Sequence, residues 1–285
     1  MNSKIIILLI TISLLFGCAT AKKNNGIALN YFEYSRGMSS PTHADIYMKY
    51  EDNDYTLSDV FMEDQSFFED NSIIPNAFLK PLINLKISDA IKAFTEPYYS
   101  YRFIHFFKNY PNFGIGVEFI HHKVFMMDKD QKVHLSGTYR GENIDEQVRV
   151  GDYLDLFTIS HGINHASFHL VYRWLFSPSA NAPEGRFQPY VNVSFGPAIP
   201  HLEIDTVEDD GARRRAYSYQ SALTNWGFGF GTGIRYKPWK KLGFYLEYKL
   251  TYSYLKGMHF DEITGTRVSV DFLSHHLQWG LSFMF

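Results

Sequence analysis

The last stretch of the chain, residues 271–285, alternates between large apolar side chains and smaller or polar ones. The apolar set occupies every second position and is interrupted only by a histidine: Leu273, His275, Leu277, Trp279, Leu281, Phe283 and Phe285. A strand with this pattern has one apolar and one polar face, as a transmembrane strand needs between lipid and lumen. A terminal aromatic strand of this kind predicts an outer-membrane barrel, and the alternative is the edge strand of a soluble sandwich.

The same period of two recurs along the chain. With the terminal strand it predicts eight strands, at residues 27–34, 98–107, 113–125, 166–176, 189–196, 225–236, 242–255 and 271–285. The links alternate in length: short links fall at 108–112, 177–188 and 237–241, and long ones at 35–97, 126–165, 197–224 and 256–270. This alternation is typical of short periplasmic turns and long outer loops. The chain is therefore predicted to be all-β, an eight-stranded antiparallel transmembrane β-barrel with long extracellular loops.

The first long link has patterns of its own. Residues 44–50 and 55–62 resemble strands, and residues 73–94 have apolar side chains at helical spacing, interrupted by Pro81. We interpret 37–97 as a large extracellular loop or cap that carries a helical insert. The alternative is an amphipathic element that lies in the outer leaflet and holds a lipid or acts as a lid.

The N-terminus predicts export. Lys4 precedes an apolar run over residues 5–16, which is too short to span a bilayer and suits a secretory signal. Residues 1–21 are expected to be a signal peptide and residues 22–285 the barrel. Cleavage before Cys18 is the alternative, because residues 15–18 resemble a lipobox. Cys18 is the single cysteine, so no disulfide can form within the chain.

Composition and charge limit the kinds of partner that the chain can have. The chain has 285 residues and a net charge of -3 at pH 7, and it lacks the footprint of a nucleic-acid-binding protein. The expected location is the outer membrane of a Gram-negative bacterium. The expected partners are the lipid bilayer and, during insertion, the barrel assembly machinery.

Charged residues also occupy positions predicted to face the lumen, among them Arg102, Glu118, Arg235, Glu247 and Lys249. A narrow barrel fills its interior with side chains, so we interpret them as a neutralised network. An ion pathway is the alternative.

Histidines gather at the predicted outer ends of several strands: His121, His122, His161, His165, His169, His201, His275 and His276. Such imidazoles can ligate a divalent metal, with Glu118, Glu203 or Asp205 completing the shell, or act as general bases near neutral pH. The alternative is a role as interfacial residues with an apolar body and a polar tip.

A serine hydrolase can also be assembled on paper, from Ser160, His161, Ser167, His169 and Glu203. Alternation places Ser167 and His169 together on the lumen face. No serine and histidine are predicted to face lipid together.

Several segments, in the same order, resemble the outer-membrane lipid A oxidase family of small barrels. They are residues 44–49 (ADIYMK), 97–102 (PYYSYR), 111–125 (PNFGIGVEFIHHKVF), 157–164 (FTISHGIN), 188–203 (QPYVNVSFGPAIPHLE), 219–220 (YQ), 247–253 (EYKLTYS) and 274–277 (SHHL). Two features depart from the family pattern: His161 stands where an acidic residue is expected, and the insert over residues 63–96 is longer.

The resemblance implies an OmpA-like small barrel that oxidises the proximal glucosamine of lipid A, the anchor of lipopolysaccharide, to 2-aminogluconate with molecular oxygen. Carried over to matching positions, it gives these catalytic candidates: His121, His201, His276, Glu118, Glu247 and Asn164. The metal candidates are His121, His201, His276 and Glu203. No candidate side chain accepts electrons, so a divalent or redox metal, or another cofactor, is required, and its identity stays open.

Two other functions stay open beside the oxidase. One is a non-enzymatic OmpA-like structural or binding barrel. The other is a lipid A deacylase-like hydrolase.

Overall fold

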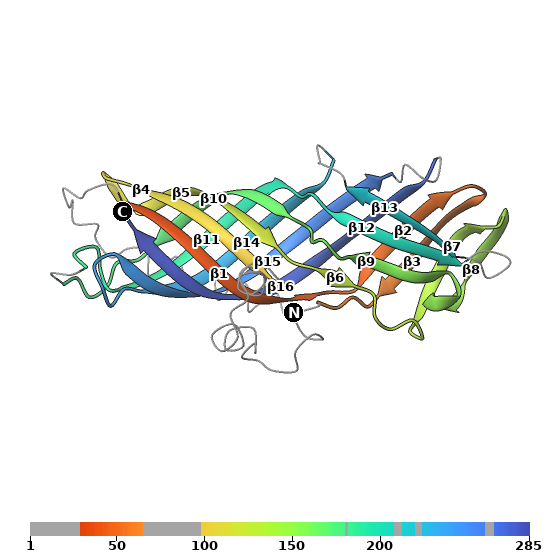
Figure 1. Ribbon diagram of the computed structural model, residues 1–285, viewed down its shortest axis with the longest axis horizontal. Coiled ribbons are helices and arrows are strands. Elements are labelled where there is room, and N and C mark those ends of the chain that lie inside the picture. The colour runs from red at the N-terminus through yellow and green to blue at the C-terminus, as the bar shows by residue number, and fades with distance from the viewer. Residues whose placement is uncertain (1–28, 65–97, 180–181, 208–212, 220–223, 260–264) are drawn as a thin grey trace, which may run out of the picture.

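The computed structural model describes residues 29–64, 98–179, 182–207, 213–219, 224–259 and 265–285. Eight strands form a closed antiparallel barrel, in the order β1-β4-β5-β10-β11-β14-β15-β16 (Figure 1). Their bounds are β1 Leu29–Pro41, β4 Tyr99–Phe107, β5 Tyr110–His121, β10 His165–Arg173, β11 Phe187–Pro197, β14 Trp226–Tyr236, β15 Leu242–Met258 and β16 Arg267–Met284. The first and last strands pair from Tyr31↔Met284 to Pro41↔Ser274, which closes the sheet. The predicted fold class is confirmed.

The barrel wall has an apolar outside and a polar inside. On β5, Ile115 and Val117 are 43% and 49% exposed, whereas Glu118 between such positions is buried. Phe228 on β14 and Leu246 on β15 are about half exposed in the same way. Large apolar side chains left uncovered around a closed barrel are a surface for lipid.

Among the residues that the structure describes, no helix is long and apolar enough to cross a membrane.

The two ends of the barrel differ in their connections. Residues 108–109 and 237–241 join neighbouring strands at the end where the chain finishes, at Phe285 (Figure 1). Three much longer connections, residues 42–98, 122–164 and 198–225, leave the other end. The predicted long link at 256–270 is wrong, because β15 and β16 extend into it and leave only residues 259–266 between them. Short turns are periplasmic in such barrels, so the end with the long connections is extracellular.

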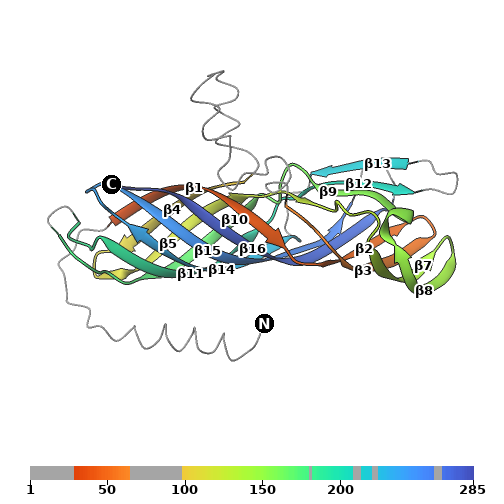
Figure 2. The ribbon, with the colours of Figure 1, turned by 90° about the horizontal axis from the view of Figure 1, so that it is seen from below.

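Beyond the membrane the chain builds a second unit, the outer sandwich. Strand β2 (Ala44–Tyr50) continues along the edge of β16 where β1 ends, and β3 (Asn53–Val60), β7 (Lys132–Tyr139) and β8 (Glu142–Arg149) extend that sheet. A second sheet has the order β13-β12-β9-β6, with bounds Arg213–Tyr219, His201–Val207, Leu154–Ile159 and Val124–Phe125. Figure 2 shows β9, β12 and β13 as a layer over β2 and β3.

One apolar core joins these two sheets. Ile46 and Leu57 of the first sheet and Phe157 and Leu202 of the second are fully buried in the same cluster. The strand patterns at 44–50 and 55–62 are thus confirmed as β2 and β3, whereas the segments 126–165 and 197–224 are more than links because they carry β7, β8, β9, β12 and β13. The helical pattern at 73–94 and the signal peptide lie outside the described residues.

Candidate functional site

Ion pairs fill the centre of the barrel. Glu33 accepts from Arg102 and Arg235 at 2.7 and 2.6 Å, and all three side chains are fully buried. Arg102 also donates to Glu247 at 2.6 Å. The predicted catalytic residue Glu247 therefore balances a buried guanidinium, as the neutralised network predicts.

Glu118 belongs to the same network. Its carboxylate is paired with Lys249 and lies 2.9 Å from His169 Nε2, and it accepts a hydrogen bond from Ser100 at 2.9 Å. With its partners filling the lumen around it, Glu118 is placed to hold the strands together.

His276 lies further out in the lumen. Its Nδ1 is 3.1 Å from Tyr98 Oη, and its Nε2 is 2.6 Å from Thr251 Oγ1. The His122 ring stands edge-on to it at 4.9 Å between centroids. His276 is buried on the inward face, with hydrogen-bond partners at both nitrogens.

His121 is placed on the other side of the wall. It has the same parity along β5 as the lipid-facing Ile115 and Val117, and its ring stacks on Tyr99 at 4.8 Å between centroids. Gly162 covers the ring so closely that an added Cβ would lie 2.4 Å from it. His121 is thus an outer-wall residue, held between an aromatic ring and a glycine turn.

Asn164 fixes the proton arrangement of His121. Its amide nitrogen donates to the carbonyls of His161, Gly162 and Ile199 at 3.1 to 3.3 Å, so its Oδ1 points the other way. His121 Nδ1 donates to that oxygen at 2.8 Å. In the neutral ring the lone pair is then on Nε2, which is the basic nitrogen of a general base.

A second group lies on the other side of the same turn. His161, His201 and Glu203 offer ligand atoms that all lie within 4.8 Å of one another, and they form the one such group among the described residues. The two imidazoles stack at 4.2 Å between centroids. Burial, and then the neighbouring His161, lower the pKa of His201 below its usual value, so its neutral form is favoured at pH 7.

The serine and histidine pairs do not have the arrangement of a catalytic triad. Ser160 Oγ and Glu203 Oε1 both approach Nδ1 of His161, at 3.0 and 3.8 Å. Inside the barrel, Ser167 and Glu118 likewise both approach Nε2 of His169. A triad needs serine and acid on opposite nitrogens of the ring, so this geometry does not favour the hydrolase alternative.

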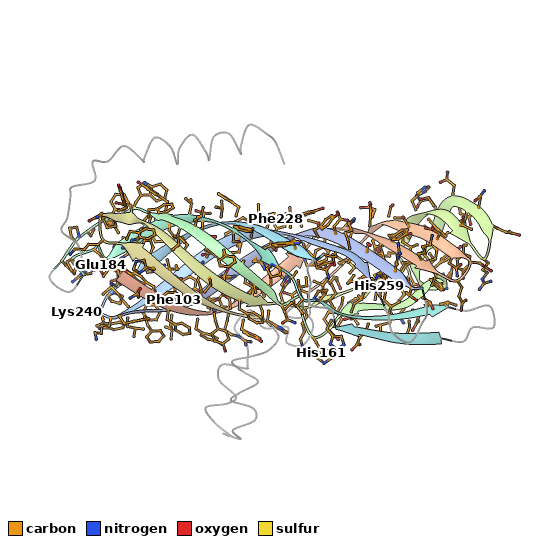
Figure 3. The ribbon with its side chains drawn as sticks, turned by 90° about the horizontal axis from the view of Figure 1, so that it is seen from above. Phe103, His161, Glu184, Phe228, Lys240 and His259 are labelled. Atoms are coloured by element: carbon orange, nitrogen blue, oxygen red, sulfur yellow. The ribbon has the colours of Figure 1, made fainter. Side chains whose placement is uncertain are left out.

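The turn at 160–164 therefore joins two clusters. It brings together four of the seven predicted site residues, His121, Asn164, His201 and Glu203, while Glu118, Glu247 and His276 lie in the lumen. Figure 3 shows His161 at the edge of the molecule, near the middle of its long axis, whereas Phe103 and Phe228 lie on the barrel half.

Sequence reasoning missed the parts of this site that are not themselves reactive. Tyr99 supports His121 by stacking, and Gly162 adopts a φ of +84° that places the turn against the ring. Asn164 also has a positive φ, of 48°. Gly162 and Asn164 are the residue types that tolerate left-handed backbone, so their spacing was a usable signal for a tight turn.

Neither a protein-family model nor a curated protein matches the chain. Solved structures of outer-membrane proteins do. Neisserial surface protein A is 10% identical, with 91% of this chain and 99% of that one covered and a TM-score of 0.34. OprG from Pseudomonas aeruginosa is 9% identical (91% and 96% covered, TM-score 0.35), and the outer membrane protease OmpT from Escherichia coli is 9% identical (93% and 98% covered, TM-score 0.39).

At these values the likenesses assign no activity to the chain. The architecture of the chain indicates its location. A closed eight-stranded barrel with a lipid-facing apolar wall resides in the outer membrane of Gram-negative bacteria.

Proposed function

We propose that this barrel oxidises the proximal glucosamine of lipid A to 2-aminogluconate with molecular oxygen, at the outer wall beside the 160–164 turn. The observation that carries the proposal is the His121 and Asn164 pair, a histidine with a fixed tautomer on the outside of the barrel. The resemblance of the surrounding segments to lipid A oxidases points to the same substrate.

The depth of His121 in the membrane suits that substrate. Its neighbour Tyr99 packs on Tyr101, and Tyr101 packs on Tyr34, each at 5.5 Å between centroids. Aromatic clusters at barrel ends lie at the level of the lipid headgroups. A glucosamine headgroup in the outer leaflet can therefore lie at the level of His121, of which 8% is exposed, without entering the filled lumen.

The reaction asks for a base at this position. Oxidation at C1 of the sugar removes two electrons and two protons, from the C1–H bond and the C1 hydroxyl, and gives a lactone. Dioxygen accepts the two electrons and the two protons and becomes hydrogen peroxide. Water then opens the lactone to the acid. His121 is placed to accept the hydroxyl proton, and a redox cofactor is needed for the electrons.

The test is mass spectrometry of lipid A from a host that makes the protein and whose lipid A has a free hydroxyl at C1. We expect one added oxygen atom on the proximal sugar. Replacing the base, His121→Ala, should lower the modified fraction by about 100-fold or more.

A matched control exists at the other end of the wall. His105 Nδ1 lies 2.9 Å from Asn30 Oδ1, so the same pair of residue types recurs near the periplasmic turns, away from the outer leaflet. His105→Ala should leave the modification intact. Equal loss in both variants, or unmodified lipid A with folded wild-type protein, would overturn the proposal.

The second candidate is a non-enzymatic barrel that binds a partner through its outer sandwich. The ion pairs that fill the lumen and the separate apolar core of the sandwich favour it. Unmodified lipid A from cells with folded protein would leave it as the better explanation.

A further inference from the structure

We propose that His161, His201 and Glu203 bind a divalent transition-metal ion at the base of the outer sandwich. Metal binding stands on the geometry of these three residues. A redox role for that metal in lipid A oxidation rests, in addition, on the proposed function.

The backbone sets the positions of the three ligands. His201 and Glu203 are two residues apart on β12, so both side chains project from one face while Leu202 between them is buried in the core. Glu203 pairs with Thr158 of β9 in the sheet. Two of the three donors thus come from a strand that is held on both of its sides.

The third ligand comes from the adjoining turn. His201 N donates to the carbonyl of Gly162 at 3.3 Å, and Gly162 N donates to Ile159 at 3.2 Å, which ties the turn to β12 and β9. The His161 side chain is 64% exposed, whereas that of Glu203 is 17% exposed. His161 is therefore the residue with room to rotate, so it can leave its stack on His201 and close the remaining distance to a shared ion.

The donor set selects the class of metal. Two imidazoles and one carboxylate, with the remaining positions open, suit iron(II), zinc and related ions, with bonds of about 2.0–2.2 Å. Magnesium and calcium prefer oxygen ligands throughout, so they should bind poorly here. An open coordination position at an exposed histidine also leaves room for a small molecule.

Within the part of the chain that the structure describes, other outer histidines lack this combination. His134 lies 2.8 Å from Asp145, and His43 lies 2.7 Å from Asp59, but each pair brings a single imidazole to a single carboxylate. His134 is therefore the matched control: an outer histidine beside a carboxylate that should contribute nothing to metal binding.

The experiment uses the full chain, folded in detergent micelles, purified without a histidine tag and stripped with EDTA. Titration calorimetry with Zn²⁺ should show one site, and Co²⁺ should give the absorption of a nitrogen and oxygen site. His201→Ala and the isosteric Glu203→Gln should each weaken binding at least about tenfold. His134→Ala should leave it unchanged, and Mg²⁺ should not compete.

Several results would overturn the site. They are a wild-type protein that binds no metal, equal weakening by His134→Ala and His201→Ala, and full affinity in a folded His201→Ala or Glu203→Gln variant. Heat-modified migration on gels checks that each variant is folded. Metal binding with unmodified lipid A would uphold the site and refute the oxidase, whereas modified lipid A without metal binding would do the reverse.

Discussion

The barrel and the outer sandwich have interiors of opposite polarity. In the barrel, Glu33 is paired with Arg102 and with Arg235, and all three side chains are fully buried. In the sandwich, Leu57 and Phe157 are fully buried among other apolar side chains. The difference follows from what lies outside each unit, because lipid receives the apolar face of a barrel strand and water receives the polar face of a sandwich strand.

One strand makes the change visible. Along the inward face of β16, Val268, Val270 and Phe272 are buried in the sandwich core, and the next residues on that face are Ser274 and His276 in the lumen. Between Phe272 and Ser274 the strand neither breaks nor shifts its pairing with β15, and the register shift of this pair lies further out, between Val270 and Val268. The boundary between the two environments therefore lies between Phe272 and Ser274.

Breaking the polar interior should have the largest effect. Glu33→Ala leaves Arg102 and Arg235 buried without their shared carboxylate, which should cost about 3–5 kcal/mol of the free energy of unfolding. Urea unfolding in lipid vesicles, followed by tryptophan fluorescence, measures it. A loss below about 1 kcal/mol would show that the network is not what holds the barrel interior.

Breaking the apolar interior should act on the sandwich alone. Leu57→Ala creates a cavity in the outer core, which should cost about 2–5 kcal/mol there. Protease added to intact cells should then cut the outer strands faster, while the barrel keeps its resistance to SDS. Loss of both would mean that the two units unfold together.

Matched substitutions on β16 test where the apolar core of the sandwich gives way to the polar lumen. Val270→Thr buries a hydroxyl in the apolar core and should cost about 1–3 kcal/mol. Ser274→Ala removes a hydroxyl from the polar lumen and should cost less than about 1 kcal/mol. Protease cutting of the outer strands measures the first cost and urea unfolding of the barrel measures the second, and equal costs would contradict a boundary between Phe272 and Ser274.

The smallest effect concerns pH. Because the pKa of His201 is lowered in the folded protein, the unfolded chain binds more protons near and below pH 6.5, so the sandwich should lose a little stability as pH falls through that range. His201→Ala should remove this part of the pH dependence. The measurement is the protease sensitivity of intact cells at pH 7.5 and pH 5.5, for the wild-type protein and for His201→Ala. An identical pH dependence in the two proteins would show that His201 is not its source.

The barrel could be predicted from the sequence because lipid and lumen impose a strict alternation on each strand. Strand β8 could not, since Glu142 to Arg149 are nearly all exposed and only Val148 is buried, which leaves no apolar pattern. Apart from β2 and β3, the strands of the outer sandwich therefore fall in segments that the sequence predicts to be loops. Its strand β12 does alternate, with Leu202 and Ile204 buried, but it is short and lies in a long connection.

The site was predictable to the extent that its residues share a strand. His201 and Glu203 are two apart, so their common face follows from strand geometry alone. The contact of His121 with Asn164 depends on how β5 meets the turn before β10, which no local pattern encodes. The alternation of residues 271–285 puts His275 on the apolar face and so predicts His276 on the opposite, inward face, where the structure has it.

The central claim is that an outer-wall site on this barrel oxidises lipid A. Its most direct test compares lipid A from cells with and without the protein, grown in air and without oxygen, in a host with a free C1 hydroxyl. We predict one added oxygen atom on the proximal sugar only with the protein and only in air. Identical spectra in all four samples, with folded protein in the outer membrane, would contradict the claim.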